Sequence, residues 1–223
     1  MNKLIKKPEE IRAIREGGKI LNSILKKVGQ EIKPGVNTSD LEALACRLAE
    51  EAGARPAFKD YPMGGGIFFP DMLCISINDE VVHGTATPGR ILNSGDIVDI
   101  DLGIIRVIKP GLKMAVLGKV IQDHAERHGY GVVRDLVGHG VGYLAHEEPA
   151  VFNYEIPDHD PENIVLQEGM VLAVEPMINS GTWRIKIDPL NKFTIKTADG
   201  SLSAHFEHTI LVTATGCEIL TLE

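Results

Sequence analysis

Residues 107–133 read VIKPGLKMAVLGKVIQDHAERHGYGVV, and residues 31–57 read EIKPGVNTSDLEALACRLAEEAGARPA. Each stretch contains Ile-Lys-Pro-Gly, continues into a segment with helix-like apolar spacing and leaves that segment through a glycine. Similar segments at two places in one chain indicate an internal repeat. The sequence therefore predicts a protein built from two related halves.

Three helices are expected in the chain. The first covers residues 8–32, where Pro8 suits an opening helical turn and apolar residues recur at helical spacing. The second follows the break KPGVNTSD, with Thr38 or Ser39 as its cap. The third runs within residues 111–129 and ends at Gly129. All three helices are interpreted as scaffold.

Short β-branched runs bounded by Gly, Pro, Asn or Asp begin after residue 66 and predict strands. They are LCISIND (73–79), GDIVDIDLGII (95–105), GMVLAVEPMI (169–178) and HFEHTILVT (205–213). Two helices followed by strands, with a further helix among the strands, are typical of an α+β architecture.

Composition excludes several classes of protein. The net charge of −8 argues against a nucleic-acid binder, which usually carries a basic excess. No stretch approaches the roughly 20 apolar residues that cross a bilayer, and the amino terminus lacks the apolar core of a signal peptide. The three scattered thiols, Cys46, Cys74 and Cys217, fit a reducing compartment. We therefore expect a cytoplasmic protein without membrane or nucleic-acid partners.

Carboxylates lie inside the apolar runs. Asp99 and Asp101 share one face of their predicted strand, Glu175 follows five apolar residues, and Glu207 precedes another apolar run. A single acid of this kind is commonly an exposed residue or half of an ion pair. Several acids with few basic residues nearby indicate a shared cation, because an unpaired buried carboxylate is unfavourable by several kcal/mol or more. Such a ligand set suits Mn, Fe, Co or Zn, and favours two ions over one.

The stretch GHGVGYLAHEEP (138–149) places His139 and His146 among three glycines. The glycines argue against a helix and predict a tight loop that another group approaches closely. Read alone, the stretch could equally be a turn with two solvated histidines. Together with the buried acids, it supplies a candidate imidazole ligand.

Five motifs in order, NDEVVHG, GDIVDIDLG, GHGVGYLAHEEP, GMVLAVEPMI and SLSAHFEHTILVT, strongly resemble type I methionine aminopeptidase. The resemblance implies a pita-bread (creatinase/aminopeptidase) fold with pseudo-twofold halves, formed by residues 1–223 as one catalytic domain. It also implies a metalloaminopeptidase with two divalent ions (Co, Mn, Fe or Zn). Such an enzyme removes the initiator methionine when the second residue is small. The enzyme is expected to be a monomer in the cytoplasm that acts on nascent polypeptides at the ribosome.

The resemblance also assigns residues by position. It implies that the metal ligands are Asp101, His139, Glu175 and a bridging Glu207, and that His83, His146 and Glu175 are catalytic. The methionine pocket would use Phe69, Cys74 and Phe193, with His83 and His146 also contacting substrate. Both aromatic residues could instead be plain core, and Cys74 a small buried residue. Asp99 receives no role, because the family varies at that position.

The chain departs from the family pattern after Ile105. A hairpin that carries a second aspartate ligand and part of a helix are missing, a loss of about 30–40 residues, comparable with a βαβ-sized unit. Either the chain omits a segment that the protein has, or the segment is truly deleted; omission is favoured because every other motif is intact. Two rival functions stay open. One is an Xaa-Pro dipeptidase of the same fold, and the other is a catalytically impaired or inactive binding protein lacking one ligand.

Overall fold

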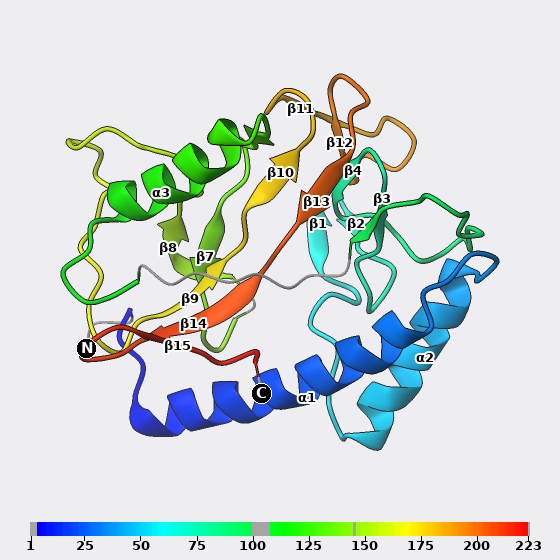
Figure 1. Ribbon diagram of the computed structural model, residues 1–223. Coiled ribbons are helices and arrows are strands. Elements are labelled where there is room, and N and C mark those ends of the chain that lie inside the picture. Colours follow the sequence, from blue (N-terminus) through cyan, green and yellow to red (C-terminus); the bar gives the residue numbers. More distant parts are fainter. Residues whose placement is uncertain (1–3, 100–107, 145, 223) are drawn as a thin grey trace.

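A computed structural model describes residues 4–99, 108–144 and 146–222 (Figure 1). The described helices are α1 (Pro8–Gln30), α2 (Thr38–Glu51) and α3 (Met114–Arg127). The described strands are β1 (Pro62–Gly64), β2 (Ile67–Phe68), β3 (Ser76–Ile77), β4 (Glu80–Val82), β5 (Val98–Asp99), β6 (Gly131–Val132), β7 (Gly138–Gly140), β8 (Glu147–Val151), β9 (Val171–Val174), β10 (Met177–Asn179), β11 (Ile185–Ile187), β12 (Ile195–Thr197), β13 (Ser203–His205), β14 (His208–Val212) and β15 (Cys217–Ile219).

The strands form small antiparallel sheets between the helices. The largest has the order β15-β14-β9-β7-β8, and two three-stranded sheets have the orders β13-β10-β6 and β11-β12-β4. In Figure 1, α1 and α2 lie side by side along one edge of the molecule, and α3 lies on the other side of the strands. The predicted α+β class is confirmed. In the described part of the chain, no helix has the length and apolarity that a bilayer crossing requires.

The predicted helices are present, with one correction at a cap. Pro8 opens α1, and the Lys7 amide donates to Glu10 across the first turn (2.7 Å). The cap of α2 is Asn37, whose side chain accepts from the Ser39 amide (3.0 Å). Prediction of Thr38 or Ser39 as the cap was therefore wrong. The Thr38 hydroxyl is buried and donates to the carbonyl of Ala86 instead (2.7 Å).

The first copy of the sequence repeat is fixed by a pair of backbone hydrogen bonds. The Gly35 amide donates to the Leu92 carbonyl (2.7 Å), and the Leu92 amide donates to the Val36 carbonyl (2.9 Å). Gly35 has φ +90°, a conformation that glycine adopts readily. Three residues after Leu92, Gly95 (φ +96°) leads into β5.

The second copy makes the same pair of bonds. The Gly111 amide donates to the Leu166 carbonyl (2.9 Å), and the Leu166 amide donates to the Leu112 carbonyl (2.8 Å). Gly111 (φ +86°) and Gly169 (φ +86°) take the same conformation as their counterparts, and Gly169 leads toward β9. The sequence echo is therefore a structural repeat, in which β5 and β9 occupy equivalent places.

Each half has its own apolar core. In the amino-terminal half, α1 and α2 pack on Leu73, Ile75 and Leu92. In the carboxyl-terminal half, residues of α3 pack with those of β9 and β14, including Leu172 and Ile210. Further apolar clusters join the two halves: α1 also packs on the carboxyl-terminal half at Leu211 and Leu220, so burial of apolar area holds the halves together as well as stabilising each one.

Adjacent glycines in α1 predict opposite effects of the same substitution. A Cβ at Gly18 would lie 2.3 Å from the carbonyl oxygen of Leu220, whereas a Cβ at Gly17 meets nothing within 4 Å. Gly18→Ala should therefore lower the free energy of unfolding by about 2–3 kcal/mol through overpacking. Gly17→Ala should raise it by roughly 0.5–1 kcal/mol, because alanine loses less backbone entropy in a helix. Urea unfolding of both variants measures the difference, and equal effects would refute the packing of α1 against the carboxyl-terminal segment.

Candidate active site

His139 lies on a strand, which corrects the prediction of a loop for residues 138–149. It belongs to β7, which pairs with both β8 and β9. The prediction that glycines mark a close approach is confirmed, and the approaching group is backbone. A Cβ at Gly138 would lie 2.2 Å from the carbonyl oxygen of Ala173, and one at Gly140 would lie 2.1 Å from that of Glu148. The glycines thus let three strands come together around His139.

His139, Glu175 and Glu207 converge as the sequence predicts. Each offers a ligand atom, and these atoms all lie within 4.8 Å of one another. The Nε2 atom of His139 is 3.3 Å from Oε1 of Glu175. Its Nδ1 lies 2.9 Å from the Gly140 carbonyl, to which a protonated Nδ1 donates, so Nε2 is left with its lone pair toward the carboxylates. One imidazole with two carboxylates is a donor set that fits a divalent transition metal.

The two glutamates lie between strands rather than within them. Glu175 follows β9 and precedes Pro176, while Glu207 separates β13 from β14. The prediction of one continuous strand through each acid was therefore wrong, although both acids adjoin strands. Glu175 is buried, and this burial raises its pKa, with further effects from His205 and Glu207. A buried carboxylate with a raised pKa is suited to accept a proton.

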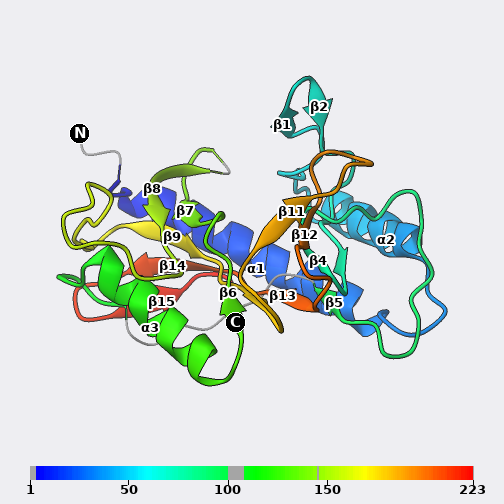
Figure 2. The ribbon, with the colours of Figure 1, turned by 90° about the horizontal axis from the view of Figure 1, so that it is seen from above.

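His146 stands beside this cluster on the connection between β7 and β8. Its ring centroid is 4.3 Å from that of His139 and 5.1 Å from that of Tyr61. Tyr61 precedes the β1–β2 hairpin, which projects on the same side as the β7–β8 connection in Figure 2. Partial desolvation, and then the charge of His139, lower the pKa of His146.

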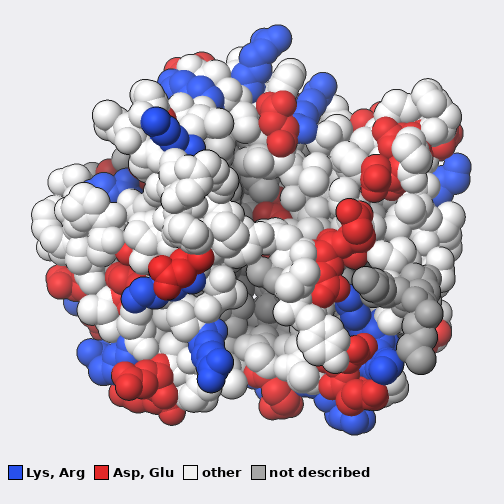
Figure 3. Space-filling view, turned by 180° about the vertical axis from the view of Figure 1, so that it is seen from behind, with Lys and Arg blue, Asp and Glu red and all other residues white. Residues whose placement is uncertain are grey.

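Figure 3 shows the opposite side of the molecule from Figure 1, where the surface is hollowed near its centre.

The predicted pocket residues also come together. The Phe69 ring packs edge-on against Phe193, with centroids 5.8 Å apart, and against His83, with centroids 6.5 Å apart. The Cys74 sulfur accepts from the backbone amide of His83 (3.1 Å). His83 has φ +59°, and Thr194 donates to its carbonyl (2.8 Å). Burial lowers the pKa of His83, which favours its neutral form.

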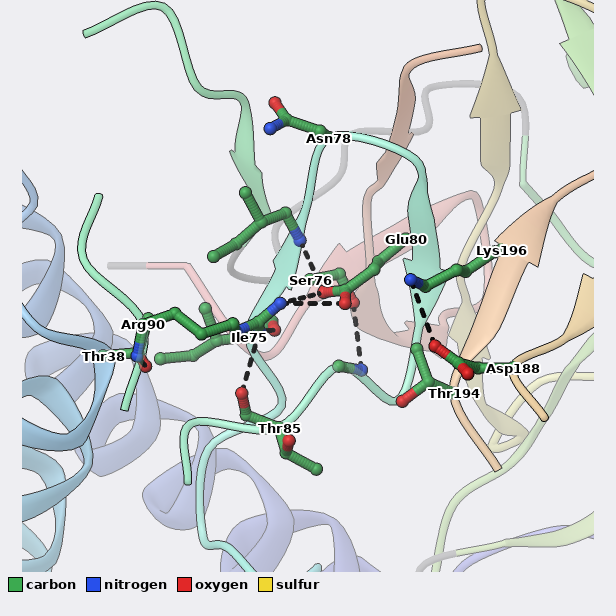
Figure 4. A network of polar contacts seen from close by, with 12 residues as sticks. Thr38, Ile75, Ser76, Asn78, Glu80, Thr85, Arg90, Asp188, Thr194 and Lys196 are labelled. Atoms are coloured by element: carbon green, nitrogen blue, oxygen red, sulfur yellow. Dashed lines mark hydrogen bonds and ion pairs between the residues drawn. The ribbon is translucent and has the colours of Figure 1, made fainter. Parts of the chain in front are cut away.

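A polar network supports the segment that carries Cys74 and His83 (Figure 4). Arg90 donates from Nη1 to both oxygens of Glu80 (2.8 Å each). From Nη2 it donates to the carbonyls of Ile75 (3.0 Å) and Thr85 (2.8 Å). One guanidinium therefore binds β4, through Glu80, and the backbone at Ile75 and Thr85, which lie before and after His83 in the chain.

One predicted ligand lies outside the described residues, and one neighbour of the cluster was not predicted. Asp101 is not among the described residues. His205, on β13, has its Nε2 3.3 Å from Oε2 of Glu175. Asp99 accepts from the backbone amide of His205 (2.9 Å). A sequence signal for His205 existed, because it lies two residues before Glu207 and can share its face.

Electrostatics around His205 and Asp99 reflect their burial. Burial raises the pKa of Asp99 to about 6, against the opposing effect of His205. Burial alone lowers the pKa of His205, but the contact with Glu175 and the nearby carboxylates outweigh it and raise that pKa. Carboxylates and imidazoles alternate along one row of contacts, from Asp99 through His205 and Glu175 to His139.

Comparison with known proteins identifies this arrangement. The sequence model of metallopeptidase family M24 matches residues 12–106 and 103–214. A methionine aminopeptidase of Clostridium acetobutylicum is 40% identical over 255 aligned positions, which cover 98% of both chains. The crystal structure of methionine aminopeptidase from Thermotoga maritima superposes with a TM-score of 0.90 at 35% identity, covering 98% of this chain and 99% of that one.

More distant structures share the fold alone. A prolidase from Pyrococcus horikoshii superposes with a TM-score of 0.71 at 22% identity, and this chain covers only 64% of it. The match to methionine aminopeptidases is closer in sequence, in structure and in length. The predicted pita-bread fold is confirmed by these superpositions. This chain therefore belongs to metallopeptidase family M24 and, within it, to the methionine aminopeptidases.

Proposed function

We propose that the chain hydrolyses the bond after an amino-terminal methionine, using divalent metal ions and acting when the second residue is small. The observation that carries this proposal is the convergence of His139, Glu175 and Glu207 within 4.8 Å. That cluster lies in a chain that aligns along nearly its whole length with methionine aminopeptidases.

We propose Asp101, His139, Glu175 and Glu207 as the ligands of two ions, with Glu207 bridging. For Asp101 the support comes from the repeat. Gly95 and Gly169 are equivalent, and Asp101 and Glu175 each follow six positions after their glycine. This correspondence in the repeat supports a ligand role for Asp101 like that proposed for Glu175. Cobalt, manganese, iron and zinc all suit such a set.

Bound divalent cations would supply Lewis acidity to a water molecule and to the scissile carbonyl. Glu175 then accepts the proton of the attacking water and passes it to the leaving amine, a role that its raised pKa supports. Neutral His83 assists this transfer near the leaving nitrogen. His146 donates toward the oxygen of the scissile carbonyl, where negative charge develops.

Selectivity for methionine is assigned to Phe69, Cys74 and Phe193. The edge-on packing of the two aromatic rings gives a rigid apolar wall, and sulfur contacts with aromatic edges favour a thioether. His83 packs against this wall at Phe69, and His146 lies beside His139 of the cluster. We propose nascent polypeptides, met at the ribosome in the cytoplasm, as the substrates of a monomeric enzyme formed by one catalytic domain.

We further propose that about 30 residues of the family pattern are missing after Ile105. The alignment with the Clostridium acetobutylicum enzyme spans 255 positions, 32 more than the 223 residues of this chain. The two matches to the family model meet at residues 103–106. Only six residues lie between Asp101 and Ile108, where the second Ile-Lys-Pro-Gly begins, and none of them is an acid that could be the second aspartate ligand of the family. The intact mass of the expressed protein distinguishes the two explanations. A mass well above 24.3 kDa would show that the protein contains a segment omitted from this sequence, whereas a mass of 24.3 kDa would show that the segment is deleted.

A peptide assay tests the function against its rivals. With Mn²⁺ or Co²⁺ added, we expect release of methionine from Met-Ala-Ser and no release of alanine from Ala-Pro. The reverse preference would instead support an Xaa-Pro dipeptidase. Turnover of neither peptide, despite measurable metal uptake, would support a binding protein that lost activity with the missing aspartate.

A further inference from the structure

His205 occupies a position opposite His139 across one carboxylate. Oε1 of Glu175 is 3.3 Å from Nε2 of His139, and Oε2 of the same side chain is 3.3 Å from Nε2 of His205. His205 is held there by β13, which pairs with β10 so that His205 faces Met177. One buried carboxylate thus stands between two imidazole nitrogens that come from different strands.

The Nε2 atom of His205 is a buried polar atom without a hydrogen bond in the described part of the chain. It is fully buried, and within the described part of the chain it has no hydrogen-bond partner of acceptable geometry. The short distance to Glu175 is therefore a close approach without alignment. Leaving a buried polar nitrogen without a partner costs about 1–3 kcal/mol, so such atoms call for an explanation. The neighbouring buried His208 shows the usual solution, since its Nδ1 lies 2.7 Å from the hydroxyl of Thr221.

The opposite edge of the His205 ring faces a second carboxylate. Oδ2 of Asp99 accepts from the backbone amide of His205 at 2.9 Å and lies 3.9 Å from its Nδ1. When a cation binds at Nε2, the ring proton must be on Nδ1, the nitrogen on the side of Asp99. A carboxylate on that side is the arrangement found behind histidine ligands of metals. Asp99 therefore stabilises the tautomer that a metal bound at Nε2 requires.

We propose that His205 Nε2 is a ligand of the metal centre on the Oε2 side of Glu175, with Asp99 as its positioning residue. This inference rests on the metal centre of the proposed function and adds a second imidazole to it. His205 lies outside the tight group of His139, Glu175 and Glu207, so it serves a cation position displaced toward β13.

Cobalt binding to the full chain tests this assignment. Titration calorimetry gives stoichiometry and affinity, and the visible absorption of bound Co²⁺ reports its ligands independently of activity. We expect His205→Gln to weaken at least one cobalt site by about 10-fold or more and to alter the absorption band. Asp99→Asn should weaken it by about 10-fold, as is typical when the group behind a ligand is changed. His208→Gln is the matched control and should leave both measurements unchanged.

Thermal unfolding of the metal-free variants shows whether each is folded, and the rise in melting temperature on adding cobalt gives a second measure of binding. If His205→Gln does not fold, Asp99→Asn carries the test. Cobalt affinity and spectrum unchanged in the folded variant would overturn the inference and leave His205 as an ion-pair partner of Glu175. The proposed function would survive that result, provided the unaltered chain binds cobalt and cleaves Met-Ala-Ser. A chain that binds no cobalt would overturn both.

Discussion

Replacing Glu175 with glutamine will lower kcat for Met-Ala-Ser by about 10³-fold or more, because it removes the proposed proton acceptor. It also converts a proposed metal ligand into a weaker neutral one. The amide fills the same volume and removes a charge that burial disfavours. The free energy of unfolding of the metal-free protein should therefore change by less than about 1 kcal/mol.

The measurement combines steady-state kinetics with metal content. Glu168→Gln makes the same chemical change at an exposed glutamate and should retain full activity. A Glu175→Gln variant that is folded and as active as the starting protein would end the assignment of Glu175. Activity restored by raising the metal concentration would show that Glu175 acts as a ligand and not as the proton acceptor.

Replacing Arg90 with methionine will lower the free energy of unfolding by about 3 kcal/mol, because Glu80 is buried and would lose its charged partner. Two backbone carbonyls, those of Ile75 and Thr85, would lose donors as well. Both belong to the segment that carries Cys74 and His83. We therefore also expect a higher KM for methionyl peptides.

Urea unfolding measures this effect, and Arg55→Met, at an exposed arginine, is the control. Each single change, Arg90→Met or Glu80→Gln, removes the same interaction. The loss in free energy of unfolding of the double variant should therefore be smaller than the sum of the two single losses, by at least about 1 kcal/mol. Strict additivity would contradict a coupled ion pair.

The helices could be predicted from the sequence because their signals are local. Apolar spacing, Pro8 and Gly129 lie within or beside the helices that they define. Most strands could not be predicted, since many have only two or three residues and depend on distant partners. β4 pairs with β12, for example, where Val82 faces Ile195. No local pattern encodes that pairing.

The site shows the same division. The acids Glu175 and Glu207 could be recognised because charge in an apolar run is unusual and needs an explanation. The glycines around His139 predict a loop, whereas His139 lies on β7, because glycines also occur where backbones nearly touch. The isolation of His205 Nε2 depends on how β13, β5 and Glu175 meet in space. Only the folded chain determines that.

The two halves contribute different things to the site. His139, Glu175 and Glu207 all follow residue 108, whereas Phe69, Cys74 and His83 all precede residue 99. Phe193, from the later stretch, packs on Phe69, so the proposed methionine pocket and the proposed proton transfer by Glu175 and His83 both need side chains from the two halves. Neither half alone therefore holds the complete proposed site, and two separately expressed halves would have to reassociate before they cleaved a peptide.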